Sequence, residues 1–280
     1  MTLLLQIMRT KLLMLNPVAF VVFFMLGYVS AAAAALDHSA ARLFQARPQH
    51  GAWTAGLEIK LAEGWKTYWR LPGDSGVPPQ FDWSRSTNLA AVTIGWPAPR
   101  RFTDAAGEAI GYHDKIVLPL RVDPADPQKP IGLALSLFYA VCKDICIPVQ
   151  EELAVEIHPH GRGSAADQAL LADFASRIPA SSGTGSLPRI HALRVIGSGA
   201  GSVLEVSVEG KLPPESIDIF VEGYPKAYFR KPSAAEGTND ASRFRLKIDG
   251  LTDVAELRGR ELTLTLTSGA RSLVQTMIVE

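Results

Sequence analysis

The chain has 280 residues, with 28 Lys and Arg against 28 Asp and Glu, and a formal net charge of +0. A neutral chain without a basic run lacks the electrostatic footprint of a nucleic-acid-binding protein, so we expect no nucleic-acid partner. Hydrophobic residues make up 47% of the chain, which is enough to bury one large core or two ordinary ones.

The beginning of the chain has the pattern of an export signal. Arg9 and Lys11 form a positive segment, Val18 to Leu26 is an apolar run, and Ala31 to Ala35 offers small residues for cleavage. The apolar run is shorter than the ~20 residues that span a bilayer, and we expect no later segment to cross one. We therefore expect a cleaved signal peptide over residues 1–35 and a periplasmic protein, with an uncleaved anchor as the alternative.

Alternating apolar residues predict β-strands over much of the first half. The predicted strands are Gly51–Leu61, Lys115–Val122, Ile131–Tyr139 and Glu151–Ile157. The stretch from Leu71 to Pro79 is rich in turn residues, and we expect little regular structure there.

A helix and then a second group of strands are predicted beyond these. Ala165–Ile178 has apolar residues at helical spacing, with Ser164 as a candidate N-cap. Pro179 to Pro188 is rich in Ser and Gly, and we expect a linker there. Short strands are then predicted at Ile190–Ile196, Ser202–Val208, Ile217–Val221, Ala227–Arg230, Arg243–Ile248, Glu261–Thr267 and Leu273–Val279. Their number and spacing are typical of a β-sandwich.

The chain contains two cysteines, Cys142 and Cys146. In an exported protein they can form a disulfide, but closing a loop of about five residues stabilises a protein by only roughly 2 kcal/mol. The flanking strands predict a hairpin with the pair at its tip, where Lys143 to Ile145 must turn to bring the sulfurs within bonding reach. This favours thiol–disulfide exchange, in which one cysteine forms a mixed disulfide and the other resolves it.

Two other interpretations of the pair stay open. One is a structural disulfide that is never reduced. The other is copper(I) binding by two soft thiolates, with His113, His158 or His160 as added ligands.

Three stretches of the sequence resemble the N-terminal periplasmic domain of the thiol:disulfide interchange protein DsbD, and within it an ScsB-like subgroup. They are Gly64–Gly76 continuing to Trp83, Gly111–Leu120, and Tyr139–Pro148 with both cysteines. The resemblance covers most of residues 40–160, and the second half resembles the extra sandwich of ScsB-like proteins. The cysteine spacing is shorter here than in the best-known members.

The resemblance implies an immunoglobulin-like fold and a redox-active cysteine pair. It implies that Cys146 forms the mixed disulfide with a partner and that Cys142 resolves it. It also implies a cap loop over the pair, which here corresponds to Arg101–Ile110 and carries Phe102. Electrons would pass between a separate membrane electron-transfer protein and exported thioredoxin-fold proteins.

Aromatic residues near the matched stretches are candidates for supporting roles at this site. They are Tyr68, Phe102, Tyr112 and Tyr139. The neighbouring tryptophans Trp69, Trp83 and Trp96 are better explained as sandwich core.

We therefore predict an all-β protein of two immunoglobulin-like β-sandwich domains joined by a short helix and linker. The expected limits are 36–162 for the redox domain, 163–186 for the helix and linker, and 187–280 for the second sandwich. The predicted function is protein-disulfide reductase or interchange activity, related to copper tolerance, with no cofactor and no bound metal. The alternative is a non-catalytic copper(I)-binding or partner-binding module with a structural hairpin disulfide.

Overall fold

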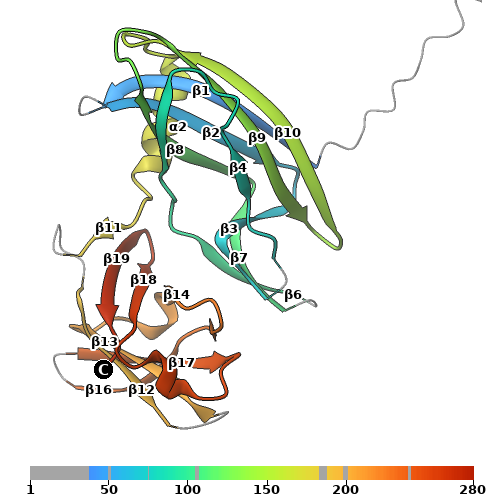
Figure 1. Cartoon of the computed structure of the whole chain (residues 1–280). Helices are drawn as coiled ribbons and strands as arrows, with labels where there is room; N and C mark the ends of the chain where they lie inside the picture. The colour runs from blue at the N-terminus through green and yellow to red at the C-terminus, as the bar shows by residue number, and fades with distance from the viewer. Residues whose placement is uncertain are drawn as a thin grey trace, which may run out of the picture. The chain divides into compact units, whose positions relative to one another are not determined.

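The computed structural model describes residues 38–49, 52–74, 76–104, 107–182, 188–197, 201–238 and 241–280 (Figure 1). The expected signal peptide lies outside the described residues. The regular secondary structure of the described part is almost all β-strand, with one α-helix and short 3-10 turns. The predicted all-β class is therefore confirmed, while the domain limits stay a prediction.

The strands of the first half form two sheets. The first sheet has the order β1 (Ser39–Gln49), β2 (Ala52–Leu61), β8 (Lys115–Pro124), β5 (Leu89–Ile94). The second has the order β10 (Cys146–Ile157), β9 (Ile131–Cys142), β3 (Lys66–Gly73), β7 (Gly107–His113), β6 (Arg100–Asp104), and β4 (Gln80–Asp82) also pairs with β9. Long β9 and β10 run side by side in Figure 1.

Side chains that alternate along β9 build the core between these sheets. Ile131, Leu133, Leu135, Leu137 and Tyr139 are all fully buried. They belong to one cluster with buried residues of β2 and β8. Period-two alternation places every second side chain on the same face of a strand, so the sequence pattern leads directly to this core.

Helix α2 (Ala165–Ala175) packs its buried Leu171 and Phe174 against the first sandwich. Ser164 is its N-cap, as predicted, and its side chain accepts a hydrogen bond from the Asp167 backbone N–H. The helix ends earlier than the predicted Ile178. Beyond Ala175, Arg177 and Ile178 donate to the Phe174 and Ala175 carbonyls in a tighter turn, and Pro179 disfavours helical backbone at Ile178.

The strands of the second half form two further sheets around a separate core. One has the order β11 (Ala180–Ser181), β19 (Arg271–Ile278), β18 (Glu261–Ser268), β14 (Ile217–Glu222). The other has the order β12 (Ile190–Ile196), β13 (Val203–Glu209), β17 (Ala241–Asp249), β15 (Tyr228–Phe229), with β16 (Ser233–Thr238) also on β17. The 3-10 turns η2 (Pro214–Ser216) and η3 (Val254–Leu257) connect strands.

The structure corrects two sequence-based expectations. Leu71 to Gly73, expected to be irregular, are the last residues of β3. Ala180 and Ser181, expected to lie in the linker, form β11 and pair in parallel with Leu273 and Val274 of β19. In both places pairing with a strand distant in sequence supplies hydrogen bonds that the local turn-rich pattern does not predict.

Several strands were not predicted. Besides β11, these are β1, β3, β4, β5, β6, β7 and β16. Most lack a strict alternation of apolar and polar residues, and β1 carries Arg and Gln side chains among its apolar ones.

Candidate redox site

The two cysteines form a disulfide at the tip of the β9–β10 hairpin. Cys142 is the last residue of β9 and Cys146 the first of β10, and the strand register pairs them directly, with their Cα atoms 4.2 Å apart. Lys143 to Ile145 make the turn between them. The hairpin predicted from the flanking strands is thus confirmed.

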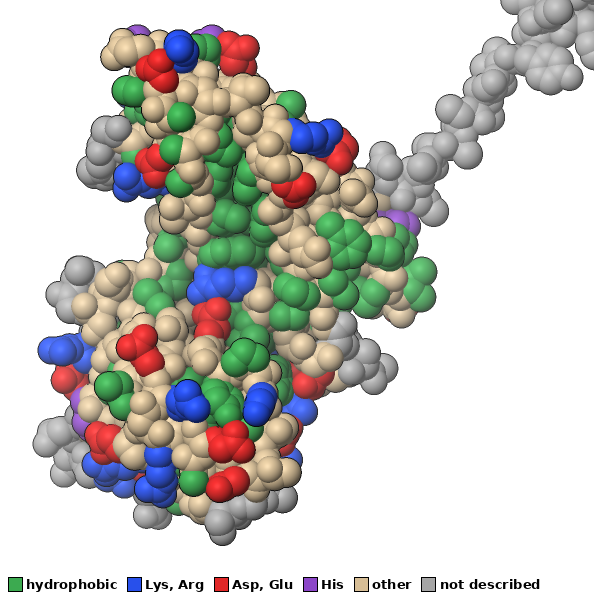
Figure 2. Space-filling view, viewed as in Figure 1, with side chains coloured by type: hydrophobic (Ala, Val, Ile, Leu, Met, Phe, Trp, Pro, Cys, Tyr) green, Lys and Arg blue, Asp and Glu red, His purple; other side chains and the backbone are tan. Residues whose placement is uncertain are grey.

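The two halves of the disulfide differ in exposure. Cys142 is only 2% exposed, whereas Cys146 is exposed. Its neighbour Ile145 is 66% exposed. In the view of Figure 2, hydrophobic side chains gather on the side of the molecule where this hairpin ends. A thiolate arriving from solvent therefore meets Cys146 first.

One face of the second sheet carries the site. Residues paired across antiparallel strands share a face, and successive residues alternate between faces. The register is set by three pairs: Lys66 with Cys142, Tyr68 with Gly111, and Phe102 with Ala109. Tyr68, Phe102 and Cys142 therefore lie on one face, and they form a small cluster with Ala109 and Ala140. We call these five residues the disulfide cluster.

Tyr68 of β3 is the polar group of the disulfide cluster. Its side chain is buried, and its hydroxyl donates a hydrogen bond to Cys142 Sγ at 2.7 Å and lies 3.4 Å from Cys146 Sγ. Thr67, the preceding residue, donates from Oγ1 to the Ala140 carbonyl at 2.9 Å and so ties β3 to β9. A hydroxyl aimed at Cys142 Sγ is placed to stabilise negative charge on that sulfur.

Phe102 of β6 covers part of the disulfide cluster. Its ring is partly buried against the cluster and meets the His113 ring edge-on, with centroids 4.3 Å apart. His113 Nδ1 lies 3.1 Å from the Trp65 carbonyl oxygen. The expected cap, Arg101–Ile110, thus corresponds to β6 and the start of β7, with Ala105 and Ala106 outside the described residues.

The structure does not bring Tyr112 and Tyr139 to the disulfide. Both face the main core, on the opposite side of the sheet from Tyr68 and Cys142. Tyr112 donates to the Pro97 carbonyl at 2.8 Å. Burial raises the pKa of both phenols, that of Tyr112 well above its usual value.

The Tyr139 hydroxyl has its own partners on that side. It donates to Glu151 Oε1 at 2.8 Å and lies 2.8 Å from Ser39 Oγ. Both tyrosine hydroxyls therefore make their hydrogen bonds within the first sandwich. Among the contacts of the described residues, neither hydroxyl binds a sulfur atom.

Gly111 is a site residue that sequence reasoning did not single out. A Cβ at this position would lie 1.9 Å from the Thr67 carbonyl oxygen, so only glycine allows β7 to approach β3 this closely. The strand pairing holds Tyr68 opposite Gly111. The sequence feature that could have indicated this role is that Gly111 begins Gly111–Leu120, one of the three stretches that carry the family resemblance.

Of the histidines suggested as copper ligands, His113 lies on β7 beside Phe102, whereas His158 and His160 follow the far end of β10. Within the described residues, no group of three or more His, Cys, Asp or Glu side chains is arranged to hold a metal ion. His158 pairs with Glu156 at 3.0 Å just beyond the far end of β10 from Cys146. A strand of that length separates its ends by roughly 35 Å, so His158 and Cys146 do not share a site.

Comparison with known families identifies the part of the chain that carries this geometry. Residues 32–156 match the family model of the N-terminal domain of thiol:disulfide interchange protein DsbD. This part of the chain is a DsbD N-terminal-like domain. Residues 177–280 match a second model, described as a domain of unknown function (DUF8393). A comparison with curated proteins finds no significant match.

A solved structure is similar in fold to most of this chain. The chain is similar to the crystal structure of the N-terminal periplasmic domain of ScsB from Proteus mirabilis, with a TM-score of 0.67 and 20% sequence identity. The match covers 87% of this chain and 94% of that one. The immunoglobulin-like architecture is thereby confirmed. Among the described residues, no helix has the length and apolar character needed to span a membrane.

Proposed function

We propose that this protein carries out thiol–disulfide exchange through Cys142 and Cys146. It would act in the periplasm after removal of a signal peptide, and pass electrons between a membrane electron-transfer protein and exported thioredoxin-fold proteins. The observation that carries the proposal is the asymmetric disulfide, exposed at Cys146 and buried at Cys142 beside the Tyr68 hydroxyl. Its position in a DsbD N-terminal-like domain supports the same chemistry.

The exchange begins at the exposed sulfur. A partner thiolate attacks Cys146 Sγ, the Cys142–Cys146 bond breaks, and a mixed disulfide forms between the partner and Cys146. The electron pair of the broken bond leaves on Cys142 Sγ as a thiolate. A second partner thiol then attacks the mixed disulfide and releases Cys146, so the partner is oxidised to a disulfide and this pair gains two electrons and two protons. The reverse sequence reduces an acceptor.

Tyr68 assists the step in which Cys142 leaves. Burial in apolar surroundings disfavours a thiolate, and the Tyr68 hydroxyl at 2.7 Å offsets this with a hydrogen bond to sulfur. A leaving thiol with a lower pKa leaves faster. The arrangement therefore suits Cys142 as the resolving cysteine and Cys146 as the one that bonds to partners.

Trapping of the mixed disulfide tests the proposal. With Cys142→Ser, the Cys146 thiol has no resolving partner, so we expect it to accumulate as a mixed disulfide with a thioredoxin-fold protein in the exported compartment. Non-reducing electrophoresis and mass spectrometry of the adduct measure this. Cys146→Ser is the matched control, because its remaining thiol is buried and should capture far less.

Two outcomes would contradict the proposal. One is that neither single variant captures a protein. The other is that the native disulfide does not open under mild reductant, seen by intact mass as no gain of two hydrogens, which is the behaviour of a structural disulfide.

A further inference from the structure

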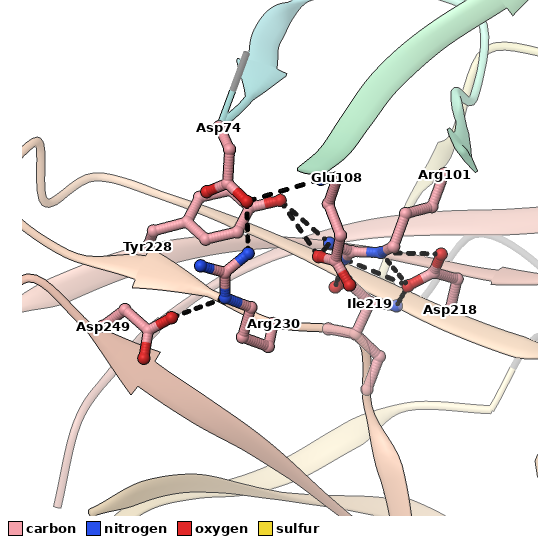
Figure 3. Close-up of polar contacts among 8 residues, drawn as sticks. All are labelled: Asp74, Arg101, Glu108, Asp218, Ile219, Tyr228, Arg230 and Asp249. Carbon is pink, nitrogen blue, oxygen red and sulfur yellow. Dashed lines mark hydrogen bonds and ion pairs between the residues drawn. The ribbon is translucent and has the colours of Figure 1, made fainter. Parts of the chain in front are cut away.

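The β6–β7 hairpin has two faces that serve different parts of the molecule. On one face, Phe102 and Ala109 belong to the disulfide cluster. Arg101 and Glu108 are their chain neighbours, so they point to the other side of the same strands. On that side the side chains of the hairpin meet the second sandwich (Figure 3).

Arg101 makes the main contact with the second sandwich. Its side chain is 4% exposed, and its Nε lies 3.2 Å from Asp218 Oδ2 of β14. It also donates to the Ile219 carbonyl at 3.2 Å and lies over the Phe220 ring at 5.1 Å. Nη1 binds Glu108 Oε2 at 2.8 Å within the hairpin. Burial, the largest single effect, would lower the pKa of Arg101, but the charge and hydrogen bond of Asp218 together with the charges of Tyr228 and Glu108 outweigh it, and the pKa is raised.

Tyr228 and Arg230 make a second connection from around β15. The Tyr228 hydroxyl donates to Glu108 Oε2 at 3.2 Å. Arg230 binds Asp249 Oδ2 at 2.5 Å and also pairs with Asp74, whose carboxylate accepts the Glu108 backbone N–H at 3.4 Å. The hairpin is thus joined to the second sandwich on both of its strands.

We infer that the second sandwich holds the β6–β7 hairpin over Cys142, with Arg101 and Asp218 as the positioning residues. A buried guanidinium is costly to leave without its carboxylate. Moving the hairpin away from the disulfide cluster would separate Arg101 from Asp218 and uncover Cys142 at the same time. The Arg101–Asp218 contact therefore sets how readily Cys142 becomes accessible to solvent. The consequence for thiol–disulfide exchange rests on the proposed function.

Chemical labelling of Cys142 tests this directly in the full chain. In Cys146→Ser, Cys142 is the single thiol, and its rate of alkylation by iodoacetamide under native conditions reports how often the cluster opens. Adding Asp218→Asn should raise that rate about five- to thirtyfold, the change expected when one interaction of this kind is removed from a two-state equilibrium. Arg101→Gln should do the same, and the double variant should add little, because both act through one contact.

Glu222→Gln is the matched control. It breaks another ion pair between the sandwiches, Arg70 Nε to Glu222 Oε1 at 2.7 Å, which does not involve the hairpin. We expect its labelling rate to stay close to that of Cys146→Ser. An equal rise in Glu222→Gln and Asp218→Asn would overturn the inference, because it would mean general loosening.

A milder variant guards against misfolding. Tyr228→Phe removes only the hydroxyl that contacts Arg101 and Glu108, and should raise the labelling rate by a smaller factor and speed amide hydrogen exchange in β6 and β7. Unchanged labelling and exchange in both Tyr228→Phe and folded Asp218→Asn would overturn the inference. Labelling needs no partner protein, so this failure is distinct from a failure of Cys142→Ser to trap one.

Discussion

The two sulfurs of the disulfide differ because they end different strands. Cys142 lies on the face of β9 where the side chains of Tyr68 and Phe102 pack beside it, whereas Cys146 begins β10, at the edge of its sheet. An exposed electrophilic sulfur and a buried leaving sulfur are what a directional exchange requires. Tyr68 adds a hydrogen bond to the sulfur that must carry charge.

Removing the Tyr68 hydroxyl should slow opening of the disulfide. Hydrogen bonds to charged groups contribute about 1.5–3 kcal/mol, so Tyr68→Phe should lower the rate constant for reduction by dithiothreitol about tenfold or more. Stopped-flow measurement of the thiols released checks this. Tyr112→Phe is the matched control, since its hydroxyl binds the Pro97 carbonyl on the opposite face. Equal rates for the two variants would show that the Tyr68 hydrogen bond has no part in the reaction.

At the scale of the elements, the site depends on the close approach of β3 and β7. Their pairing at Lys66, Thr67 and Tyr68 leaves no space for a side chain at Gly111. The register shifts beyond Tyr68, where β3 continues into the turn-rich stretch and ends at Gly73. Gly111 therefore allows the close pairing of β7 with β3 that positions Tyr68 beside the disulfide.

Gly111→Ala should separate β7 from β3. Because the new Cβ meets backbone rather than a flexible side chain, we expect a loss of about 1–3 kcal/mol in the free energy of unfolding. Urea unfolding of the oxidised protein measures it. Gly201→Ala serves as control, as no described atom lies within 4 Å of its added Cβ. A Gly111→Ala protein as stable as this control would contradict the packing described for β3 and β7.

At the scale of the whole molecule, the second sandwich contributes a residue to the first core. Phe220 of β14 is 1% exposed and belongs to the cluster of the first sandwich. Its ring meets Trp69 edge-on, with centroids 5.7 Å apart. The five tryptophans of the chain all lie in its first half, so their fluorescence reports on the first sandwich and on the Phe220 contact made with it.

Phe220→Ala should therefore change the first sandwich although the substitution is in the second. We expect a loss of about 3 kcal/mol or more in unfolding free energy and a red shift of native tryptophan emission as Trp69 becomes solvated. Phe244→Ala removes an equally buried ring from the second core, and should destabilise the protein without that shift. Identical emission from both variants would argue against the Trp69–Phe220 contact.

The sequence by itself determined the features that depend on local pattern. Alternating side chains predicted β2, β8, β9 and most strands of the second half, and Ser164 marked the start of α2. The Cys142–Cys146 hairpin followed from the two strands around it and the reach of a short loop. Each of these depends on residues within one or two turns or strands, where periodicity and capping act directly.

Only the tertiary structure decided which side chains surround the disulfide. Four aromatic residues were candidates in the sequence, yet Tyr68 and Phe102 lie beside Cys142 while Tyr112 and Tyr139 face the core. The face of a side chain depends on strand register, and a shift of one residue would reverse it. The Arg101–Asp218 contact likewise joins residues 117 positions apart. Such pairings are set by how whole sheets pack, and no local pattern in the chain encodes them.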